Sequence, residues 1–247
     1  MKQSTPPSNQ AKTHARRVIR ALQSAYPEVR CALVHENPYE LLVATILSAQ
    51  CTDARVNLTT PELFRRYPDA ARLASARPEE LEEVIRSTGF FRAKARNLLA
   101  MASRVVEAHD GEIPRRLEDL VALGGVGRKT ANVVLGTAFG IPSGVVVDTH
   151  VKRLAKRMGL TTRSTPEQIE IDLQALVPKR EWINLSHRLI QHGRLVCLAR
   201  RPRCESCSLR PICPMVGVTP AQSSTATRPK SSIKKPGKTR SRSRIET

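Results

Sequence analysis

Aromatic side chains and long apolar runs are scarce in this chain. Phe, Trp and Tyr make up 3% of its 247 residues, which argues against a protein that stacks successive single-stranded bases on aromatic rings. The amino-terminal sequence MKQSTPPSNQ lacks the apolar segment of a secretory signal peptide, and the longest apolar stretch, around Leu41 to Leu47, is too short to span a bilayer. We therefore expect an intracellular protein of the bacterial cytoplasm, with no membrane partner.

Cysteines are also few, and their placement is uneven. Of six in the chain, four crowd into one short segment: Cys197, Cys204, Cys207 and Cys213. Four thiolates so close together satisfy the ligand count of tetrahedral zinc or of an iron-sulfur cluster, whereas scattered pairs would suggest disulfides. The spacing matches neither a common zinc finger nor a ferredoxin, so it predicts a metal site without naming the metal. We expect Cys31 and Cys51 to be ordinary buried thiols.

Acidic residues are outnumbered by basic ones. The chain holds 41 Lys plus Arg against 22 Asp plus Glu, which gives a formal net charge of +19 and a pI near 10.6. Such an excess indicates a polyanionic partner, with nucleic acid ahead of a membrane surface. Because aromatics are scarce, double-stranded DNA is favoured over single strands.

Strand patterns are almost absent, and helical periodicity dominates. Asn37-Pro38 and Pro78 are typical helix starts, and the helix from Pro78 should stop at Gly89. Thr165-Pro166 with Gln168 predicts a further helix through a capping box. The run Val145–Val147 is the one strongly β-like stretch, and an extended connector would explain it equally well. The predicted fold class is all-α.

The two ends of the chain are poor in apolar residues. Residues 1–11 and 216–247 consist largely of Ser, Thr, Pro and basic or polar residues, so they cannot offset the entropy lost on ordering. We expect both segments to be disordered, the second as a basic tail. Residues 14–26 have Val18, Ile19 and Leu22 in helical register and should form the first ordered helix.

A glycine-rich turn occupies residues 123–127, directly before a helical segment. Gly124, Gly125 and Gly127 permit close backbone approach, and the amides at the following helix start can hold a phosphate of DNA. The spacing G-x-x-x-x-G-K of a nucleotide-binding P-loop is absent. Simple helix capping is the alternative role for these glycines.

Lys129 and Asp148 are the candidate reactive residues. Lys129 stands just after the turn, where it would serve either as one more phosphate-binding cation or as a nucleophile whose neutral form is favoured by the helix dipole and by partial burial. Asp148 is placed to cap a helix, and an ionised carboxylate there also suits stabilisation of a cationic sugar.

Four features in order resemble the endonuclease III branch of the helix-hairpin-helix DNA glycosylases, over roughly residues 14–214. They are Leu47-Ser-Ala-Gln-Cys-Thr-Asp53, the hairpin Leu123 to Lys129 continuing as Thr-Ala-Asn-Val-Val, Val147-Asp-Thr-His150, and the four-cysteine spacing. The resemblance implies a two-domain helix-hairpin-helix glycosylase fold: a six-helix barrel over residues 31–141 and an iron-sulfur cluster domain formed by residues 12–30 and 142–215. It also implies DNA bound at the cleft between them. We expect the chain to act as a monomer.

The resemblance further implies the chemistry. Lys129 matches the family's Schiff-base lysine, Asp148 its catalytic carboxylate, and the four cysteines the ligands of a [4Fe-4S] cluster regarded as structural and DNA-positioning. The implied activity is removal of oxidised pyrimidines from damaged double-stranded DNA, followed by strand cleavage through β-elimination.

The resemblance assigns DNA contacts as well. Gln50 matches the side chain that fills the gap left by a flipped nucleotide, and Phe90 falls where the family has an apolar wedge, although packing in the core is an equal alternative for Phe90. The hairpin residues expected to contact DNA are Gly125, Gly127, Arg128 and Thr130.

Two departures and two rival functions accompany this interpretation. Gly124 stands where the hairpin often has Pro, which should loosen the turn but keep its amides, and the connector Pro142–Gly144 is one residue longer than in well-known members. An adenine-mismatch glycosylase is disfavoured because that branch lacks a lysine at the position of Lys129. A non-catalytic duplex-binding module is disfavoured because Lys129 and Asp148 occur together.

Overall fold

The computed structural model describes residues 7–218, and this part of the chain is helical with no β-strand. The all-α prediction is confirmed. The α-helices are α1 (Asn9–Ala25), α2 (Pro38–Leu47), α3 (Asp53–Arg66), α4 (Ala70–Ala74), α5 (Pro78–Ile85), α6 (Phe91–His109), α7 (Leu117–Val121), α8 (Arg128–Phe139), α9 (Thr149–Arg157), α10 (Pro166–Leu176) and α11 (Trp182–Leu195). Three short 3-10 helices are η1 (Arg86–Thr88), η2 (Lys179–Glu181) and η3 (Arg210–Ile212).

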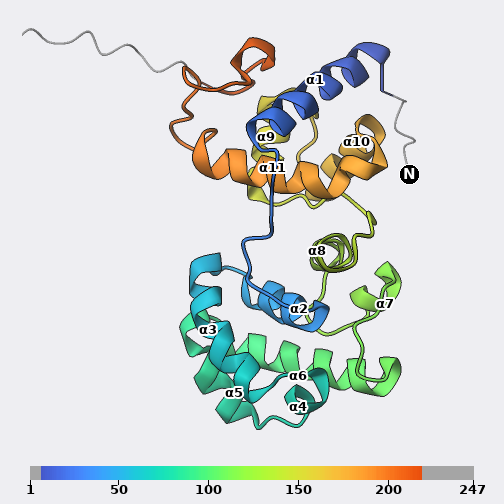
Figure 1. Cartoon of the computed structure of the whole chain (residues 1–247), viewed down its shortest axis with the longest axis vertical. Helices are drawn as coiled ribbons and strands as arrows, with labels where there is room; N and C mark the ends of the chain where they lie inside the picture. Colours follow the sequence, from blue (N-terminus) through green and yellow to red (C-terminus); the bar gives the residue numbers. More distant parts are fainter. Residues whose placement is uncertain (1–6, 219–247) are drawn as a thin grey trace, which may run out of the picture.

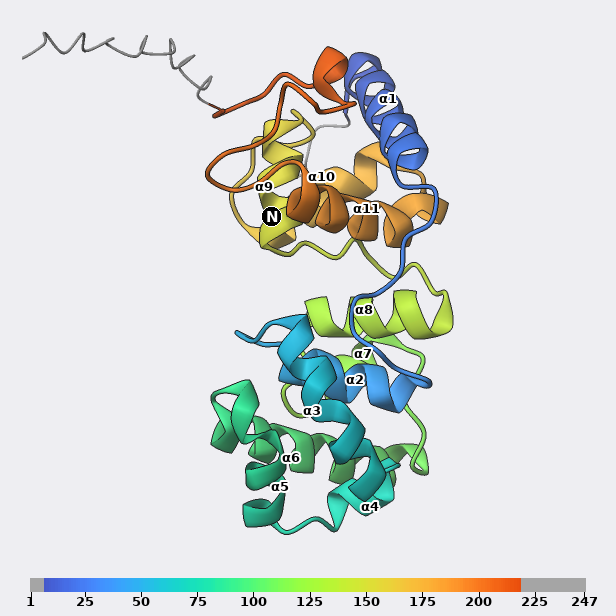
Figure 2. The same cartoon turned by 60° about the vertical axis from the view of Figure 1, so that its left-hand side comes forward.

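Two hydrophobic cores organise these helices. One core is built from side chains between Leu33 and Leu135, most of which belong to helices α2 to α8. The other combines Ala15 to Leu22 of α1 with side chains between Val145 and Leu209. Figures 1 and 2 show the two groups of helices one above the other, with α8 between them and the connectors before α2 and after α8 crossing from one group to the other.

Side-chain caps explain where most helices begin. Asn37 Oδ1 accepts a hydrogen bond from Glu40 N at 2.9 Å, and Thr165 Oγ1 accepts from Gln168 N at 3.4 Å. The helix that starts at Pro78 ends as an α-helix at Ile85, earlier than expected, and η1 continues the turn to Gly89, whose φ of 71° favours glycine. The predicted starts at Pro38, Pro78 and Pro166 are confirmed.

Val145–Val147 is an extended connector, not a strand. Val145 and Val147 are buried in the second core, and the Val146 amide donates to Ser186 Oγ at 3.1 Å. The β-branched side chains therefore serve burial rather than sheet pairing.

The amino-terminal expectation needs a correction. Helix α1 begins at Asn9, because Ser8 Oγ accepts a hydrogen bond from Ala11 N at 3.2 Å, so residues 9–11 are helical and not disordered. Almost all of the expected basic tail, residues 219–247, and residues 1–6 lie outside the described residues.

The range expected to hold a six-helix barrel contains seven α-helices, α2 to α8. Two of them, α4 and α7, are five residues long, and α4 begins separately because Asp69 caps it after α3 has ended at Arg66. Across residues 7–218, no helix is both long enough and apolar enough to cross a membrane.

Candidate active site

The glycine-rich turn forms a hairpin between α7 and α8 that is packed tightly on α6. A Cβ added at Gly124 would lie 2.8 Å from Ala100 Cβ and 3.1 Å from the Met101 backbone nitrogen, so only glycine fits there. Gly125 has a φ of 73°, and Gly127 is the residue that precedes α8. Glycine at position 124 thus lets the turn approach α6 closely, and the expected loosening of the turn stays a prediction.

Lys129 lies in the first turn of α8 and lines a large cleft. The cleft has a volume of about 610 Å³, and its walls come from both groups of helices, including Gln50, Thr130 and Asp148. Lys129 is exposed within the cleft, so the partial burial expected for it is not found. Its amine can thus reach a ligand bound in the cleft.

Asp148 both caps a helix and lines the cleft, as the sequence suggested. Its Oδ1 accepts a hydrogen bond from Val151 N at 2.7 Å and so caps α9. The same residue lines the cleft with Lys129. The amino-terminal ends of α8 and α9 therefore bring a lysine and a carboxylate to one cavity.

Arg128 is engaged with the second group of helices. Its Nε and Nη2 donate to Glu170 of α10 at 3.0 Å and 3.2 Å, and Asn132 Nδ2 donates to the same carboxylate at 3.1 Å. A Cβ at Gly144 would collide with both Glu170 and Asn132, so the backbone closes directly over this network. Sequence reasoning missed Glu170, although a charged residue beside the apolar positions Ile169 and Leu173 was a signal for it.

Gln50 and Phe90 share an unusual backbone conformation. Their φ angles are 54° and 50°, in the left-handed region that costs a non-glycine residue free energy. Phe90 is 67% exposed, so core packing is the wrong alternative for it. Gln50 lines the cleft, while Phe90 stands on the surface at the start of α6.

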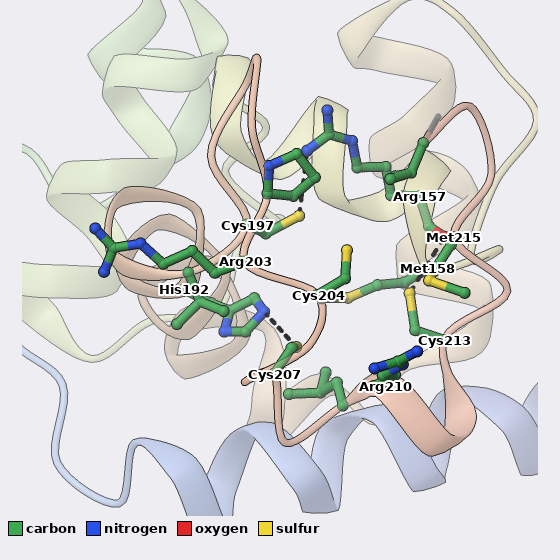
Figure 3. A pocket seen from close by; sticks show the side chains of 14 residues that line it. Arg157, Met158, His192, Cys197, Arg203, Cys204, Cys207, Arg210, Cys213 and Met215 are labelled. Atoms are coloured by element: carbon green, nitrogen blue, oxygen red, sulfur yellow. Dashed lines mark hydrogen bonds between the residues drawn. The ribbon is translucent and has the colours of Figure 1, made fainter. Parts of the chain in front are cut away.

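The four clustered cysteines line one pocket beside α9 and α11. Figure 3 shows Cys197, Cys204, Cys207 and Cys213 around this pocket. Among residues 7–218, no three His, Cys, Asp or Glu side chains are spaced to hold a single metal ion.

Neighbouring side chains hold these thiols. Arg157 Nη1 donates to Cys197 Sγ at 3.3 Å, and His192 Nε2 lies 3.6 Å from Cys207 Sγ. Burial raises the pKa of the Cys207 and Cys213 thiols, which disfavours thiolates unless a cation compensates them. Cys31 and Cys51 are partly buried against the first core and take no part in this pocket.

Comparison with known proteins places this arrangement in a family. A model described as HhH-GPD superfamily base excision DNA repair protein matches residues 43–179. Endonuclease III of Synechocystis sp. is 54% identical over 203 residues, which is 82% of this chain and 93% of that protein. The chain belongs to the endonuclease III branch of the HhH-GPD superfamily. Endonuclease III of Bacillus subtilis is 46% identical over 76% of this chain and 86% of its own length.

Solved structures of the endonuclease III branch share the fold. A non-covalent Endonuclease III-DNA complex and a trapped Endonuclease III-DNA covalent intermediate each superpose with a TM-score of 0.79 at 43% identity, covering 83% of this chain and 95% and 96% of theirs. The sequence resemblance to this branch is therefore confirmed, as is the helix-hairpin-helix glycosylase fold.

Proposed function

We propose that this chain is a bifunctional DNA glycosylase and AP lyase of base excision repair, which removes oxidised pyrimidines from damaged double-stranded DNA and then cleaves the strand. One observation carries the proposal: Lys129 and Asp148, at the starts of α8 and α9, line the same cleft. Membership of the endonuclease III branch supports it, since solved relatives include a covalent complex with DNA.

The first step is base release. The neutral amine of Lys129 attacks C1′ of the flipped deoxyribose as the bond from C1′ to the base breaks, and the base leaves with the bonding pair and gains a proton. Asp148 stabilises the positive charge that develops on the sugar and assists proton transfer. The sugar ring opens, and Lys129 is left joined to C1′ as an imine.

The second step is strand cleavage. The imine withdraws electrons and acidifies the C2′ proton, whose removal expels the 3′ phosphate as the C3′–O bond breaks. This is β-elimination. Water then hydrolyses the imine and restores the Lys129 amine, so the cycle needs no external oxidant or reductant.

The hairpin supplies the DNA-binding surface in this proposal. The backbone amides at Gly125, Gly127 and Thr130 face a phosphate at the start of α8, where the helix dipole favours negative charge. Arg128 keeps Nε and Nη2 on Glu170, which leaves Nη1 for the DNA backbone. The net charge of +19 favours DNA association over the whole surface. Action as a monomer in the cytoplasm stays a prediction.

The cysteine pocket is our candidate site for a [4Fe-4S] cluster. Four cysteine thiols that line one pocket match the ligand count of a [4Fe-4S] cluster, and cluster binding would supply the positive charge that stabilises them as thiolates. When bound, the group would supply cross-links among the four cysteines. These cysteines would then hold rigid the loop that carries Arg200, Arg201 and Arg203.

Borohydride trapping tests the proposed function. A duplex containing one oxidised pyrimidine is incubated with the protein, and reduction should convert the imine to a stable covalent adduct seen as a shifted band. We expect no adduct and no cleavage from Lys129→Gln, with duplex binding nearly intact, and normal trapping from the control Lys179→Gln outside the cleft. Normal turnover by Lys129→Gln would refute the mechanism.

A further inference from the structure

Lys94 is a buried lysine whose hydrogen bonds are both to backbone carbonyls. It lies on α6, is 4% exposed, and its Nζ donates to the carbonyl oxygens of Leu47 and Thr88, each at 2.8 Å. In the part of the chain that the structure describes, its ammonium forms no ion pair. Because no carboxylate of the described residues balances its charge, the two carbonyl contacts are the interactions that hold this ammonium in place.

Burial of the ammonium is unfavourable, and two features offset it. Removing a charge from water costs several kcal/mol, and burial accordingly lowers the pKa of Lys94. Leu47 is the last residue of α2, so its carbonyl lacks a partner within the helix and lies at the negative end of the helix dipole. The charged hydrogen bonds therefore satisfy two carbonyls that the helices leave free.

The two carbonyls lead directly into the two left-handed residues. Leu47 precedes Gln50 by three residues, and Thr88 precedes Phe90 by two. Because both oxygens lie 2.8 Å from one nitrogen, they are no farther apart than twice that distance. Lys94 thus joins the loop that carries Gln50 to the loop that carries Phe90.

A second contact fixes the Phe90 loop to the same part of the molecule. Ser87 Oγ lies 3.0 Å from Thr59 Oγ1 of α3, and η1 therefore cannot move freely relative to that helix. Thr52, two residues after Gln50, caps α3 by accepting from Arg55 N at 3.2 Å. Both loops are anchored to α3, and Lys94 supplies the direct link between them.

We propose that Lys94 is a positioning residue that holds Gln50 and Phe90 at one fixed separation, so that both side chains enter the base stack together when a nucleotide leaves it. The inference rests on the proposed function. Extrusion costs a few kcal/mol of stacking and pairing, which inserted side chains partly offset. Two insertions made at a fixed spacing need no further ordering of the loops, whereas independent loops would lose conformational entropy on insertion.

The test compares two substrates with one variant. Lys94→Met removes the donors but keeps the apolar stem. On a duplex with one oxidised pyrimidine, we expect single-turnover excision to slow about 10- to 100-fold, since a few kcal/mol of lost support corresponds to that range. On a single-stranded oligonucleotide with an abasic site, which has no stack to fill, we expect cleavage within about twofold of wild type. Leu98→Ala, buried on the same helix, controls for lost stability.

A mutant cycle decides whether Lys94 acts through the two loops. Lys94→Met added to Gln50→Ala and Phe90→Ala should cause little further loss on duplex, because the side chains it positions are already gone. Fully additive losses, or equal slowing on both substrates, would overturn the proposal. If Lys94→Met does not fold, Lys94→Gln carries the same comparison, because its amide nitrogen lies one bond nearer the backbone and cannot reach both carbonyls. Failure of the wild type to trap an imine would instead remove the proposed function itself.

Discussion

Arg194 and Asp53 form an ion pair that joins the two groups of helices at the edge of the cleft. Asp53 is the first residue of α3 and Arg194 lies in the last turn of α11, so each charge also complements the dipole of its own helix. Both side chains line the cleft with Lys129. The pair therefore spans the cleft from one helix group to the other.

Asp53→Asn should have only a small effect on stability. Its partner Arg194 has 45% of its side chain exposed, and pairs of this kind contribute about 1 kcal/mol or less. We expect the free energy of unfolding to fall by that amount at low salt and by less at high salt, as measured by denaturant titration. A loss that is large and independent of salt would contradict this account of the pair.

Glu170→Ala should be more disruptive. Glu170 is 6% exposed, and its removal leaves Asn132 and Arg128 without their shared acceptor beneath the helix that carries Lys129. Since Arg128 is half exposed, we expect a loss of about 1 to 3 kcal/mol in unfolding free energy rather than the full cost of breaking a buried pair. Thermal unfolding measures it, with Glu167→Gln, exposed on the same helix, as the control. Equal melting temperatures for the two variants would show that the network is not stabilising.

Asp148 variants should separate capping from chemistry. Asp148→Asn keeps a good N-cap, so stability should hold while single-turnover excision slows by about 100-fold or more. Asp148→Ala should also lower the unfolding free energy by about 1 kcal/mol. Asp69→Ala removes the corresponding cap of α4, which accepts from Arg72 N at 2.7 Å, and serves as the control with normal excision. Slowing in Asp69→Ala equal to that in Asp148→Asn would argue against a direct role for Asp148.

The four cysteines of the pocket predict the iron and sulfide content of the purified protein. Protein purified without oxygen should be brown and should contain about four iron and four sulfide per chain, as a [4Fe-4S] cluster requires. Cys204→Ala should lose that absorbance together with folded structure around the pocket, followed by circular dichroism and iron analysis. One zinc per chain with no sulfide would exclude the cluster.

The basic tail predicts a salt effect. Residues 221–247 hold eight Lys or Arg against Glu246 alone, and each phosphate contact contributes a log-log salt slope of about −0.9. Truncation after Gly217 should weaken duplex binding and make that slope shallower, without changing excision at saturating enzyme or the preference for damaged DNA. An unaltered slope would mean that the tail does not touch DNA.

Local signals in the sequence were enough for the starts of α2, α5 and α10 and for the positions of Lys129 and Asp148 at helix starts. Caps such as Asn37 and Thr165 act within one turn, so their effect can be inferred from neighbouring residues. The pairing of Arg128 with Glu170 could not be inferred in this way, because it joins residues 42 positions apart across two cores. The contacts of Lys94 could not be inferred from the sequence either, because its acceptors are backbone carbonyls, which every residue has.

The position of α1 affects the order in which the two hydrophobic cores can form during synthesis. Helix α1 is made before helices α2 to α11, yet its apolar face packs in a core completed only by residues as late as Leu209. The other core is fully synthesised once Leu135 has emerged. Val18 and Leu22 of α1 therefore lack most of their packing partners until the later part of the chain has been made, whereas the core of α2 to α8 can close before then.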